Sequence, residues 1–327
     1  MKKHRGMEKH RLRLIAAMFV FPIAIAQAQS FPNKPLRIIV PYTPGGLLDL
    51  TARQIAASLP ENLGQTVLVE NRTGAASAVA IDAVKQAPAD GYTILLDNSG
   101  LIITPILNPK ASFKMQRDLE AVSIVTGSSS LLAVNAALQA RDLKELVTLA
   151  RAKPGSLNYS SAGVGTILHM SGEMLKALAK IDLVHVPYKG GSAAMNDVVS
   201  GQIHMIFLGS SILAPFIKDG RVRPIASTGL KRIPSYPDVP TIAESGYPDY
   251  DVVSWIGLFV VKATPPEITA RLSQSVTAIL ARPDFRANLV KSSLEPIGAT
   301  GDEARRLLDI EERRWTEVIR SNKLRAE

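Results

Sequence analysis

Four loops in this sequence combine glycine with hydroxyl or amide side chains, and these are the places where a ligand could bind. They are residues 42–49, 97–100, 159–166 and 186–192. Glycine lets the backbone approach a ligand closely, and the first N–H groups of a helix carry a partial positive charge. Such loops, leading from a strand into a helix, therefore favour a carboxylate or a phosphate. An ordinary turn can have the same composition, so each loop alone is a weak signal.

One short motif points to catalysis instead. Residues 190–194 read Gly-Gly-Ser-Ala-Ala, which is similar to the Gly-x-Ser-x-Gly turn that presents a nucleophilic serine. The fifth residue is alanine rather than glycine, and the only histidine after Ser192 is His204, twelve residues away. An exported α/β serine hydrolase that uses Ser192 is therefore kept as the alternative to a binding protein.

No pattern in the sequence is typical of a metal or redox site. There is no cysteine, and His169, His185 and His204 lack the spacing of metal ligands, so structural roles are expected for them. The loop at 159–166 does not have the Gly-x-Gly-x-x-Gly spacing of a dinucleotide site. An acidic residue such as Asp49, in the first turn of a predicted helix, usually stabilises the helix dipole. We expect no metal and no cofactor.

Residues 1–28 have the layout of a secretory signal peptide. Six basic residues and one glutamate surround its start, an apolar run covers residues 14–26, and Ala26-Gln27-Ala28 allows cleavage after Ala28. The apolar run is about a dozen residues long, shorter than the roughly 20 of a membrane span, although an uncleaved N-terminal anchor is the alternative. Without cysteine for a lipid anchor or a disulfide, we expect a soluble protein of the periplasm.

The leader also accounts for more than half of the net charge. It carries +5 of the formal +9, so the mature chain keeps only +4. The remaining basic residues form no stripe along which a phosphate backbone could lie. We therefore expect no binding to nucleic acid.

Alternating apolar and amphipathic segments must position the loops. Strands predicted at 36–40, 66–70 and 92–96 alternate with helices at 49–59 and 75–85, which is typical of a parallel sheet covered on both faces. The pattern then restarts. Further strands are expected at 131–134, 157–159, 183–186, 203–207, 222–226 and 252–261, and further helices at 142–151, 166–179, 192–200, 265–281 and 302–321.

Two successive α/β units followed by a helix-rich end predict a protein of two lobes. We expect residues 29–128 to form the first part of lobe 1, residues 129–254 to form lobe 2, and residues 255–327 to return to lobe 1. Each lobe would be a mostly parallel sheet flanked by helices. Ligands bind beyond the carboxyl ends of strands in open α/β sheets, so a cleft is expected between the lobes.

A series of motifs runs in order through the mature chain, beginning with Val40-Pro41-Tyr42-x-Pro44-Gly45-Gly46-x-x-Asp49. The others are Gly64-Gln65-x-Val67, Val69-Glu70-Asn71-Arg72, Asp90-Gly91-Tyr92-Thr93, Ala152-Lys153-Pro154-Gly155, Tyr159-x-Ser161-Ala162-Gly163-x-Gly165-Thr166 with His169, Val184-His185-Val186-Pro187-Tyr188-Lys189-Gly190, Pro237-Asp238-Val239-Pro240-Thr241, Ser254-Trp255-x-Gly257 and Thr264-Pro265-Pro266-Glu267-Ile268. Together they resemble the Bug-type receptors, the periplasmic substrate-binding proteins of tripartite tricarboxylate transporters. The similarity covers essentially the whole mature chain.

The resemblance implies a two-lobed periplasmic-binding-protein (Venus flytrap) fold that closes on a small carboxylate, and a protein that is not an enzyme. Backbone amides, hydroxyl groups and ordered waters would hold the carboxylate. The implied partners are permease subunits of a tripartite transporter and a sensor kinase, and we expect a monomer. Carried over by position, the ligand-binding residues are Tyr42, Thr43, Gly45, Gly46, Asp49, Asn98, Ser99, Ser161, Gly163, Gly165, Thr166, His169 and Tyr188.

The chain departs from the family pattern at three places near the expected cleft. Leu47-Leu48 stand where the family often has Ser-Thr, Val164 and Ile167-Leu168 stand where Asn and Ser-Ser are common, and Leu208-Gly209 replace the usual Asp-Asn. Each change removes a polar group. We therefore hypothesise a ligand less polar than citrate or aspartate, such as an aromatic or longer-chain acid. The alternative is that these leucines pack beneath the loops.

Overall fold

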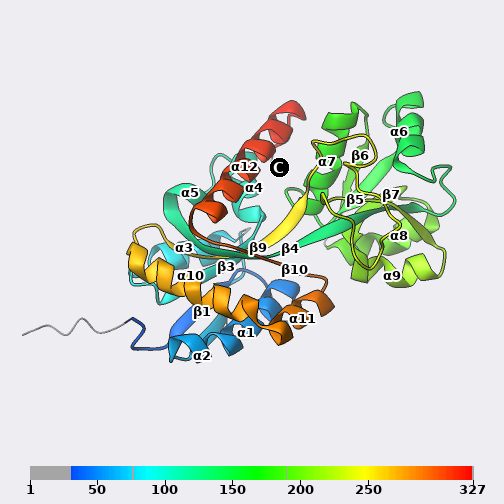
Figure 1. Cartoon of the computed structure of the whole chain (residues 1–327). Coiled ribbons are helices and arrows are strands. Elements are labelled where there is room, and N and C mark those ends of the chain that lie inside the picture. The colour runs from blue at the N-terminus through cyan, green and yellow to red at the C-terminus, as the bar shows by residue number, and fades with distance from the viewer. Residues whose placement is uncertain (1–30, 76, 189, 326–327) are drawn as a thin grey trace, which may run out of the picture. The chain divides into compact units, whose positions relative to one another are not determined.

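The computed structural model describes residues 31–75, 77–188 and 190–325, so the predicted signal peptide, residues 1–28, lies outside the described residues. Within the described chain, the strands form one sheet (Figure 1). Its strand order is β2 (Val67–Asn71), β1 (Leu36–Val40), β3 (Thr93–Asn98), β9 (Val253–Val261), β4 (Leu119–Asn135), β7 (Met205–Gly209), β5 (Asn158–Ser161) and β6 (Val184–Pro187), while β8 (Val222–Ser227) and β10 (Glu295–Ala299) also pair with β4.

The long strand β4 joins two halves of this sheet. Its residues 119–129 pair with β9, whereas its residues 130–135 pair with β7 and β8. The first half contains β1, β2 and β3, which run parallel to one another, and the second half contains β5, β6 and β7, which also run parallel. The chain therefore passes from one half to the other on a strand.

The α/β class agrees with the prediction, but the sheet is mixed rather than mostly parallel. β9 runs antiparallel to β3 and β4, and β7, β8 and β10 run antiparallel to β4. Most residues of β4 and β9 are buried. Strands buried on both faces read as continuous apolar runs, which is also how parallel strands read, so the sequence did not distinguish them.

Helices pack against both faces of each half. In the first half, Ile38 and Ile94 face the cluster that contains residues of α1, α2, α10 and α11, whereas their neighbours Ile39 and Leu95 face residues of α3, α4 and α12. This division follows from the alternation of side chains along a strand. These helices are α1 (Leu47–Ser58), α2 (Pro60–Leu63), α3 (Ala78–Lys85), α4 (Gly100–Leu107), α10 (Pro266–Ala281), α11 (Pro283–Lys291) and α12 (Gly301–Ser321), and the short α5 (Met115–Asp118) precedes β4.

The second half is arranged in the same way. Leu131 and Ala133 of β4 pack with residues of α8 and α9, whereas Leu132 and Val134 face α6 and α7. The helices are α6 (Leu143–Ala152), α7 (Ile167–Ala179), the 3₁₀ helix η1 (Gly191–Ala194), α8 (Met195–Ser200) and α9 (Ser210–Lys218).

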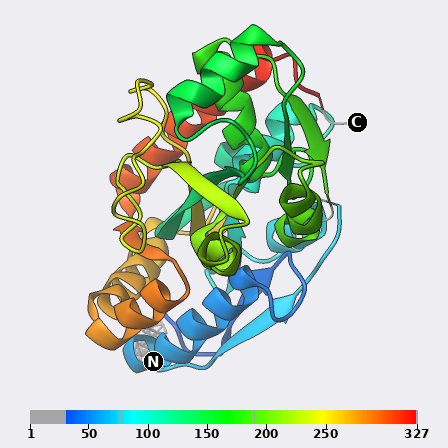
Figure 2. The same ribbon diagram turned by 90° about the vertical axis from the view of Figure 1, so that its right-hand side faces the viewer.

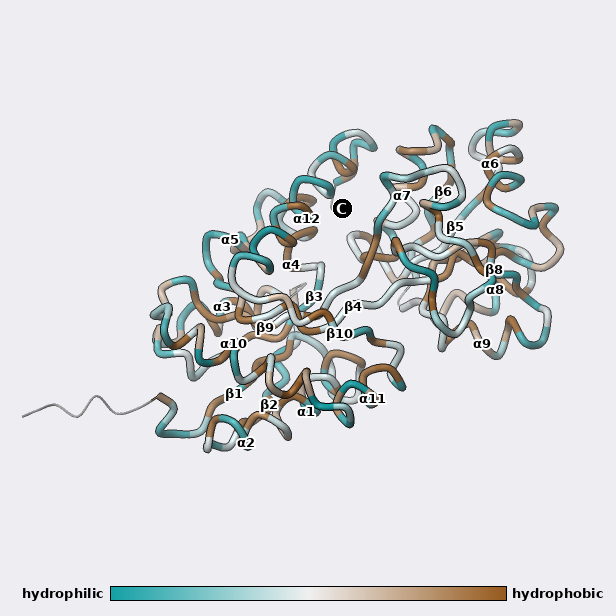
Figure 3. Tube along the Cα trace, viewed as in Figure 1, coloured by the Kyte–Doolittle hydropathy of each residue, from teal (hydrophilic) through white to brown (hydrophobic). Residues whose placement is uncertain are grey.

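The last helix, α12, contacts both halves. Its buried residues recur every three or four positions, which places them on one face, and the rest of its surface is strongly hydrophilic (Figure 3). This face packs against α4 of the first half and α7 of the second. Figure 2 shows α10 and α11 (orange) beside α1 and α2 (blue), with α12 leading away from them. The buried residues of α12 are Ala304, Leu308, Glu311, Trp315, Val318 and Ile319.

Several elements differ from their predicted bounds for local reasons. Helix α3 begins at Ala78 instead of residue 75, because Ala75 and Ser77 have positive φ. The helix predicted at 192–200 is divided into η1 and α8. The sequence did not predict α4, which is apolar on every face and contains Pro105, so that it lacks the periodicity of an amphipathic helix. It also did not predict α9, α11 or β10.

Candidate functional site

The predicted ligand-binding residues all lie at the carboxyl ends of β1, β3, β5 and β6 or in the first turn of the following helix. The first half of the sheet carries Tyr42, Thr43, Gly45, Gly46, Asp49, Asn98 and Ser99. The second half carries Ser161, Gly163, Gly165, Thr166, His169 and Tyr188. Within each half, hydrogen bonds connect many of these residues.

Asp49 fastens the loop that follows β1. The residue is only 1% exposed, and its Oδ2 accepts hydrogen bonds from the Gly45 N–H (2.8 Å) and from Arg53 Nε (3.0 Å). Its Oδ1 accepts from Asn71 Nδ2 (2.9 Å), which also donates to the Tyr42 carbonyl (2.9 Å). The Arg53 hydrogen bond in particular lowers the pKa of Asp49 to about 2. Asp49 is therefore an ionised group that determines the shape of the loop.

The rest of this loop leads into α1. The Gly46 N–H approaches the Thr43 carbonyl at 3.4 Å, and Gly46 occupies the N-cap position of α1 without a capping side chain. The first N–H groups of a helix have no acceptor within the helix, so they are available to an external anion.

The end of β3 contributes a second polar turn. Asn98 Oδ1 accepts a hydrogen bond from the Gly100 N–H (2.9 Å), and the Asn98 N–H donates to Asp97 Oδ1 (2.8 Å). Ser99 is buried, and its Oγ accepts from the Trp255 N–H of β9 at 3.4 Å. Tyr42 is 36% exposed as a residue, but loss of solvent around its hydroxyl, followed by the charge of Asp97, raises the pKa of that hydroxyl, which therefore stays protonated.

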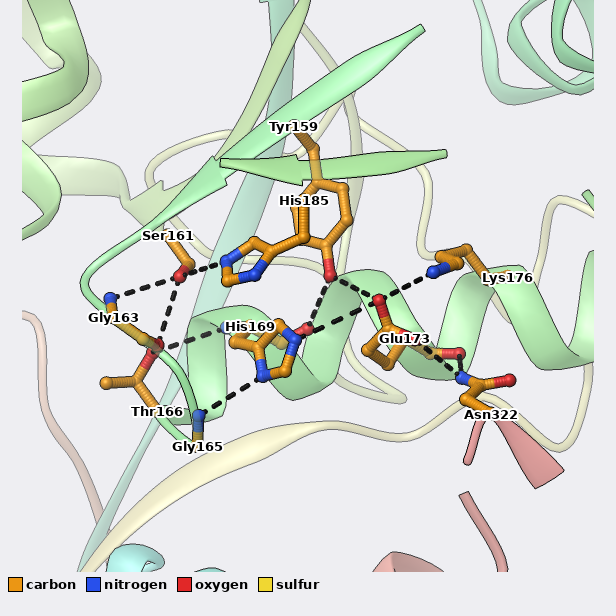
Figure 4. A network of polar contacts seen from close by, with 10 residues as sticks. All are labelled: Tyr159, Ser161, Gly163, Gly165, Thr166, His169, Glu173, Lys176, His185 and Asn322. Carbon is orange, nitrogen blue, oxygen red and sulfur yellow. Dashed lines mark hydrogen bonds and ion pairs between the residues drawn. The ribbon is translucent and has the colours of Figure 1, made fainter. Parts of the chain in front are cut away.

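In the second half, Ser161 connects the loop after β5 to His185 on β6 (Figure 4). The Ser161 Oγ lies 2.7 Å from His185 Nε2, and it also accepts from the Gly163 N–H at 3.1 Å. The Thr166 hydroxyl, which caps α7, donates to the Gly163 carbonyl (2.8 Å) and accepts from the His169 N–H (3.3 Å). The loop is thus closed by hydrogen bonds on both sides of Gly163.

His169, in the first turn of α7, also binds the loop after β5. The Gly165 N–H donates to His169 Nδ1 at 3.2 Å, so this nitrogen is unprotonated and the ring proton lies on Nε2, which is 3.9 Å from Glu173 Oε1. The rings of His169 and His185 lie 4.0 Å apart. Burial lowers the pKa of both imidazoles to about 4, so both are neutral at neutral pH.

Glu173 is the centre of the buried network under this loop. Its Oε1 accepts from the Tyr159 hydroxyl (2.7 Å) and from Lys176 Nζ (2.8 Å). Its Oε2 accepts from Asn322 Nδ2 (2.9 Å), just beyond the end of α12. The side chain is 1% exposed. A buried carboxylate needs such partners, and here they come from β5, α7 and the C-terminal segment.

Tyr188, in the loop after β6, connects the end of β5 to α8. Its N–H donates to the Ser161 carbonyl (3.1 Å), and its hydroxyl donates to Asp197 of α8 in a short hydrogen bond. This hydrogen bond raises the pKa of Tyr188 to about 12.

The glycine N–H groups that we expected to face the ligand have partners inside their own loops. The N–H of Gly45 donates to Asp49, that of Gly163 to Ser161, and that of Gly165 to His169. In this structure these glycines therefore shape the loops. The N–H groups in the first turns of α1 and α7 are therefore the backbone groups best suited to bind an anion.

The loop after β5 approaches the first half of the fold at Gly165. Its φ is +78°, and a Cβ placed there would lie 2.9 Å from the Leu107 Cδ1 at the end of α4. Gly165 belongs to the second half and Leu107 to the first. A larger residue at position 165 would therefore disturb the contact between the halves.

The apolar departures from the family pattern do not share one environment. Leu47 is 45% exposed at the start of α1. Leu48, Ile167 and Leu168 are half-buried and pack against the hydrophobic clusters. Leu208 is buried in β7. Packing beneath the loops therefore describes four of these residues, whereas Leu47 and Val164, which is 42% exposed, are presented to solvent.

Other candidate sites have different positions. Cavities of about 720 Å³ between α10 and β4 and about 920 Å³ along α1 and β2 contain none of the predicted ligand-binding residues. Ser192 lies in η1, and His204 Nδ1 is 2.7 Å from Asn158 Oδ1. In the part of the chain that the structure describes, no group of three or more metal-ligating side chains gathers, and no helix has the length and apolarity of a membrane span.

Sequence reasoning missed four residues of these networks: Asp97, Glu173, His185 and Asn322. Glu173 follows His169 by four residues on α7, so helical spacing could have placed the two side chains together. His185 was assigned to a strand without a partner, whereas the parallel pairing of β5 and β6 brings it to Ser161. Nothing in the sequence links Asn322 to Glu173.

Comparison with known proteins gives one consistent result. The family model described as "Tripartite tricarboxylate transporter family receptor" matches residues 51–324. A UPF0065 protein from the tcbD-tcbE intergenic region of Pseudomonas sp. (strain P51) is 36% identical over 298 residues, covering 91% of this chain and 89% of that protein. Protein BugT of Bordetella pertussis is 30% identical over 319 residues, covering 96% and 98%.

Solved structures agree with these relatives. An R. palustris protein solved with adipate is 30% identical, with a TM-score of 0.76 and coverage of 90% of this chain and 99% of that one. The periplasmic binding protein BugD is 29% identical, with a TM-score of 0.73 and coverage of 91% and 100%. MatC from Rhodopseudomonas palustris, solved with bound malate, is 29% identical, with a TM-score of 0.72 and coverage of 88% and 100%.

Proposed function

Because this chain belongs to the tripartite tricarboxylate transporter receptor family, we propose that it captures a small carboxylate between the two halves of its sheet and delivers it to a transporter of that class. The predicted family and the predicted binding-protein fold are both confirmed. One observation carries the proposal: the hydrogen-bonded loops after β1 and β5 present the starts of α1 and α7 at the carboxyl ends of their strands. Related proteins of this fold were solved with adipate and with malate.

We further propose that the two halves act as lobes that close on the ligand. The change of β4 partners between residues 129 and 130 supports a boundary near residue 128, and the return of the chain on β9 supports one near residue 254. These strands would serve as the hinge, with residues 255–327 returning to lobe 1. The contact of α12 with α4 and α7 would then limit the range of closure.

The ligand we propose is less polar than citrate. Leu47, exposed at the start of α1, would contact its carbon chain, while the carboxylate would lie against the first-turn N–H groups. A dicarboxylate with an apolar chain, such as the adipate bound by one relative, meets this description. An aromatic acid meets it as well.

A thermal-shift screen against carboxylates tests this function. A ligand present at 100 times its Kd stabilises the folded state by about 2.7 kcal/mol, enough to raise the melting temperature by a few degrees. Adipate or an aromatic acid should produce the larger shift, and calorimetric titration should give it a lower Kd than citrate. Tighter binding of citrate than of every longer or aromatic acid would refute the ligand class. The absence of a shift with any carboxylate would refute the function.

We propose that the protein is not an enzyme. The competing hypothesis, a hydrolase that uses Ser192, predicts ester hydrolysis that disappears in Ser192→Ala. We expect no hydrolysis of p-nitrophenyl esters by the wild type and unchanged carboxylate affinity in the variant. Hydrolysis that depends on Ser192 would overturn this proposal.

For the location, we propose export to the periplasm with cleavage after Ala28; the similar protein BugD is a periplasmic binding protein. Intact mass of the protein from the periplasmic fraction should correspond to a chain that begins at Gln29. A mass that includes residues 1–28 would favour the uncleaved anchor. We also propose that the protein binds permease subunits and a sensor kinase, which pull-down experiments test. We propose that it is a monomer, which sedimentation tests.

A further inference from the structure

Asp97 is a buried carboxyl group that none of the roles described above uses. It lies near the end of β3, next to the predicted ligand-binding residues Asn98 and Ser99, and it is 0% exposed. Its Oδ1 accepts a hydrogen bond from the Asn98 N–H at 2.8 Å. Within the described part of the chain, its Oδ2 has no hydrogen-bond partner. An ionised carboxylate with one unpaired buried oxygen would be costly.

Among the described residues, the elements next to Asp97 place no cation against its carboxyl group. The charge of Asp97 raises the pKa of the Tyr42 hydroxyl, in the loop after β1. The side chain of Ser77, before α3, acts against burial and lowers the pKa of Asp97 in part. On β9, the residue opposite Asp97 is Gly257. Helix α4 contains no charged residue, and the two charged residues of α3, Asp82 and Lys85, pair with each other. On α12, which packs against α4, the buried Glu311 pairs with Arg314.

Burial in these surroundings raises the pKa of Asp97 to about 7. The group is therefore divided between its neutral and charged forms near neutral pH. His169 and His185, with pKa values of about 4, stay neutral over the same range, and Tyr42 stays protonated. Among these four groups, Asp97 is thus the one whose charge changes between pH 6 and 8.5.

We propose that capture of a carboxylate ligand is coupled to protonation of Asp97, so that an anion at the ends of β1 and β3 and an ionised Asp97 exclude each other. This inference rests on the proposed function. Two negative charges cannot both be held at low cost in one poorly solvated region, as in paired carboxylates generally. Binding draws one proton from solvent onto Asp97, and ligand release returns it. Asp97 acts through its charge, as a positioning residue without direct contact with the ligand.

The coupling predicts a particular pH dependence of affinity. For adipate, or malate if it binds more tightly, the Kd of the wild type should rise roughly thirtyfold from pH 6 to pH 8.5, because the free protein gives up its proton while the complex keeps it. Calorimetry at pH 7.5 in buffers of different ionisation enthalpy should show uptake of about half a proton or more. Asp97→Asn, which is uncharged at every pH, should bind as tightly at pH 8.5 as the wild type at pH 6, without proton uptake. Asp238→Asn, at an exposed position, is the matched control and should behave as the wild type.

Two results would overturn the inference. One is a wild-type Kd that does not change between pH 6 and 8.5, and the other is a pH dependence that persists in Asp97→Asn. A third measurement needs neither ligand nor a folded variant: carbon NMR of the ligand-free wild type should show one aspartate carboxyl titrating near pH 7. If every aspartate titrates near its ordinary pKa, the inference fails. If the carboxyl titrates near pH 7 but no carboxylate binds at pH 6, the proposed function fails instead.

Discussion

The side-chain amide of Asn322 donates two hydrogen bonds to Glu173, one to its backbone carbonyl (2.7 Å) and one to its carboxylate (2.9 Å). Asn322 follows α12, a helix that begins in the first half of the fold, and Glu173 lies on α7 in the second. Glu173 in turn holds Tyr159 of β5, two residues before Ser161. A continuous set of hydrogen bonds and ring contacts therefore joins the C-terminal segment to the glycine-rich loop of the second half (Figure 4).

Removal of the Asn322 amide should destabilise the protein. Asn322→Ala leaves Glu173 Oε2 without this donor inside a buried network, and the expected loss is about 1–3 kcal/mol of unfolding free energy. Urea denaturation measures it, with Asn288→Ala at an exposed position of α11 as the control. Equal midpoints for the two variants would show that Asn322 contributes nothing measurable.

The stability should also depend on pH through His169. Its pKa falls from 6.5 to about 4 on folding, so the unfolded chain binds the proton more tightly. The contribution is fully present above pH 6.5 and is lost as pH falls towards 4, by up to about 3 kcal/mol. His169→Gln keeps an acceptor for the Gly165 N–H but cannot titrate, so its stability should decline less over this range. Parallel pH profiles of the two proteins, measured by denaturation, would contradict this.

The residues involved show what could and could not be predicted from sequence. Composition indicated the loops after β1 and β5 as places for a ligand, because glycine and hydroxyl residues follow a strand and precede a helix there, although an ordinary turn can have the same composition. The contacts of Asp49, Gly163 and Gly165 were beyond that reasoning, since hydrogen bonds within a loop depend on its exact backbone conformation. The pairing of Ser161 with His185 depends on the register of two parallel strands, which is not encoded in local periodicity. The antiparallel pairing of β4 with β7 and β9 could not be predicted either, because local periodicity does not show which strands pair or in which direction.

Asp49 should be important for the shape of the first loop. Asp49→Ala removes an acceptor from Gly45, Arg53 and Asn71 at once, and we expect a loss of about 2–3 kcal/mol together with weaker ligand binding. The pKa of Asp49 is lowered to about 2, so its contribution is constant above pH 4 and declines only as pH falls towards 2. Denaturation at pH 7 measures the loss, and Asp238→Ala at an exposed site is the control. A cost within 0.5 kcal/mol of the control would exclude this role.

Gly165 should tolerate alanine less well than other glycines of similar conformation. With φ at +78°, any L residue costs about 1–2 kcal/mol, and here a Cβ would also press on Leu107 at 2.9 Å. Gly220, with φ at +67° and nothing within 4 Å, provides the matched control, because Gly220→Ala carries the conformational cost alone. Unfolding free energies should therefore fall further in Gly165→Ala than in Gly220→Ala, and the excess should shrink when Leu107→Ala supplies the missing space. If both alanines cost the same and Leu107→Ala changes neither, then the contact between the two halves does not constrain this loop.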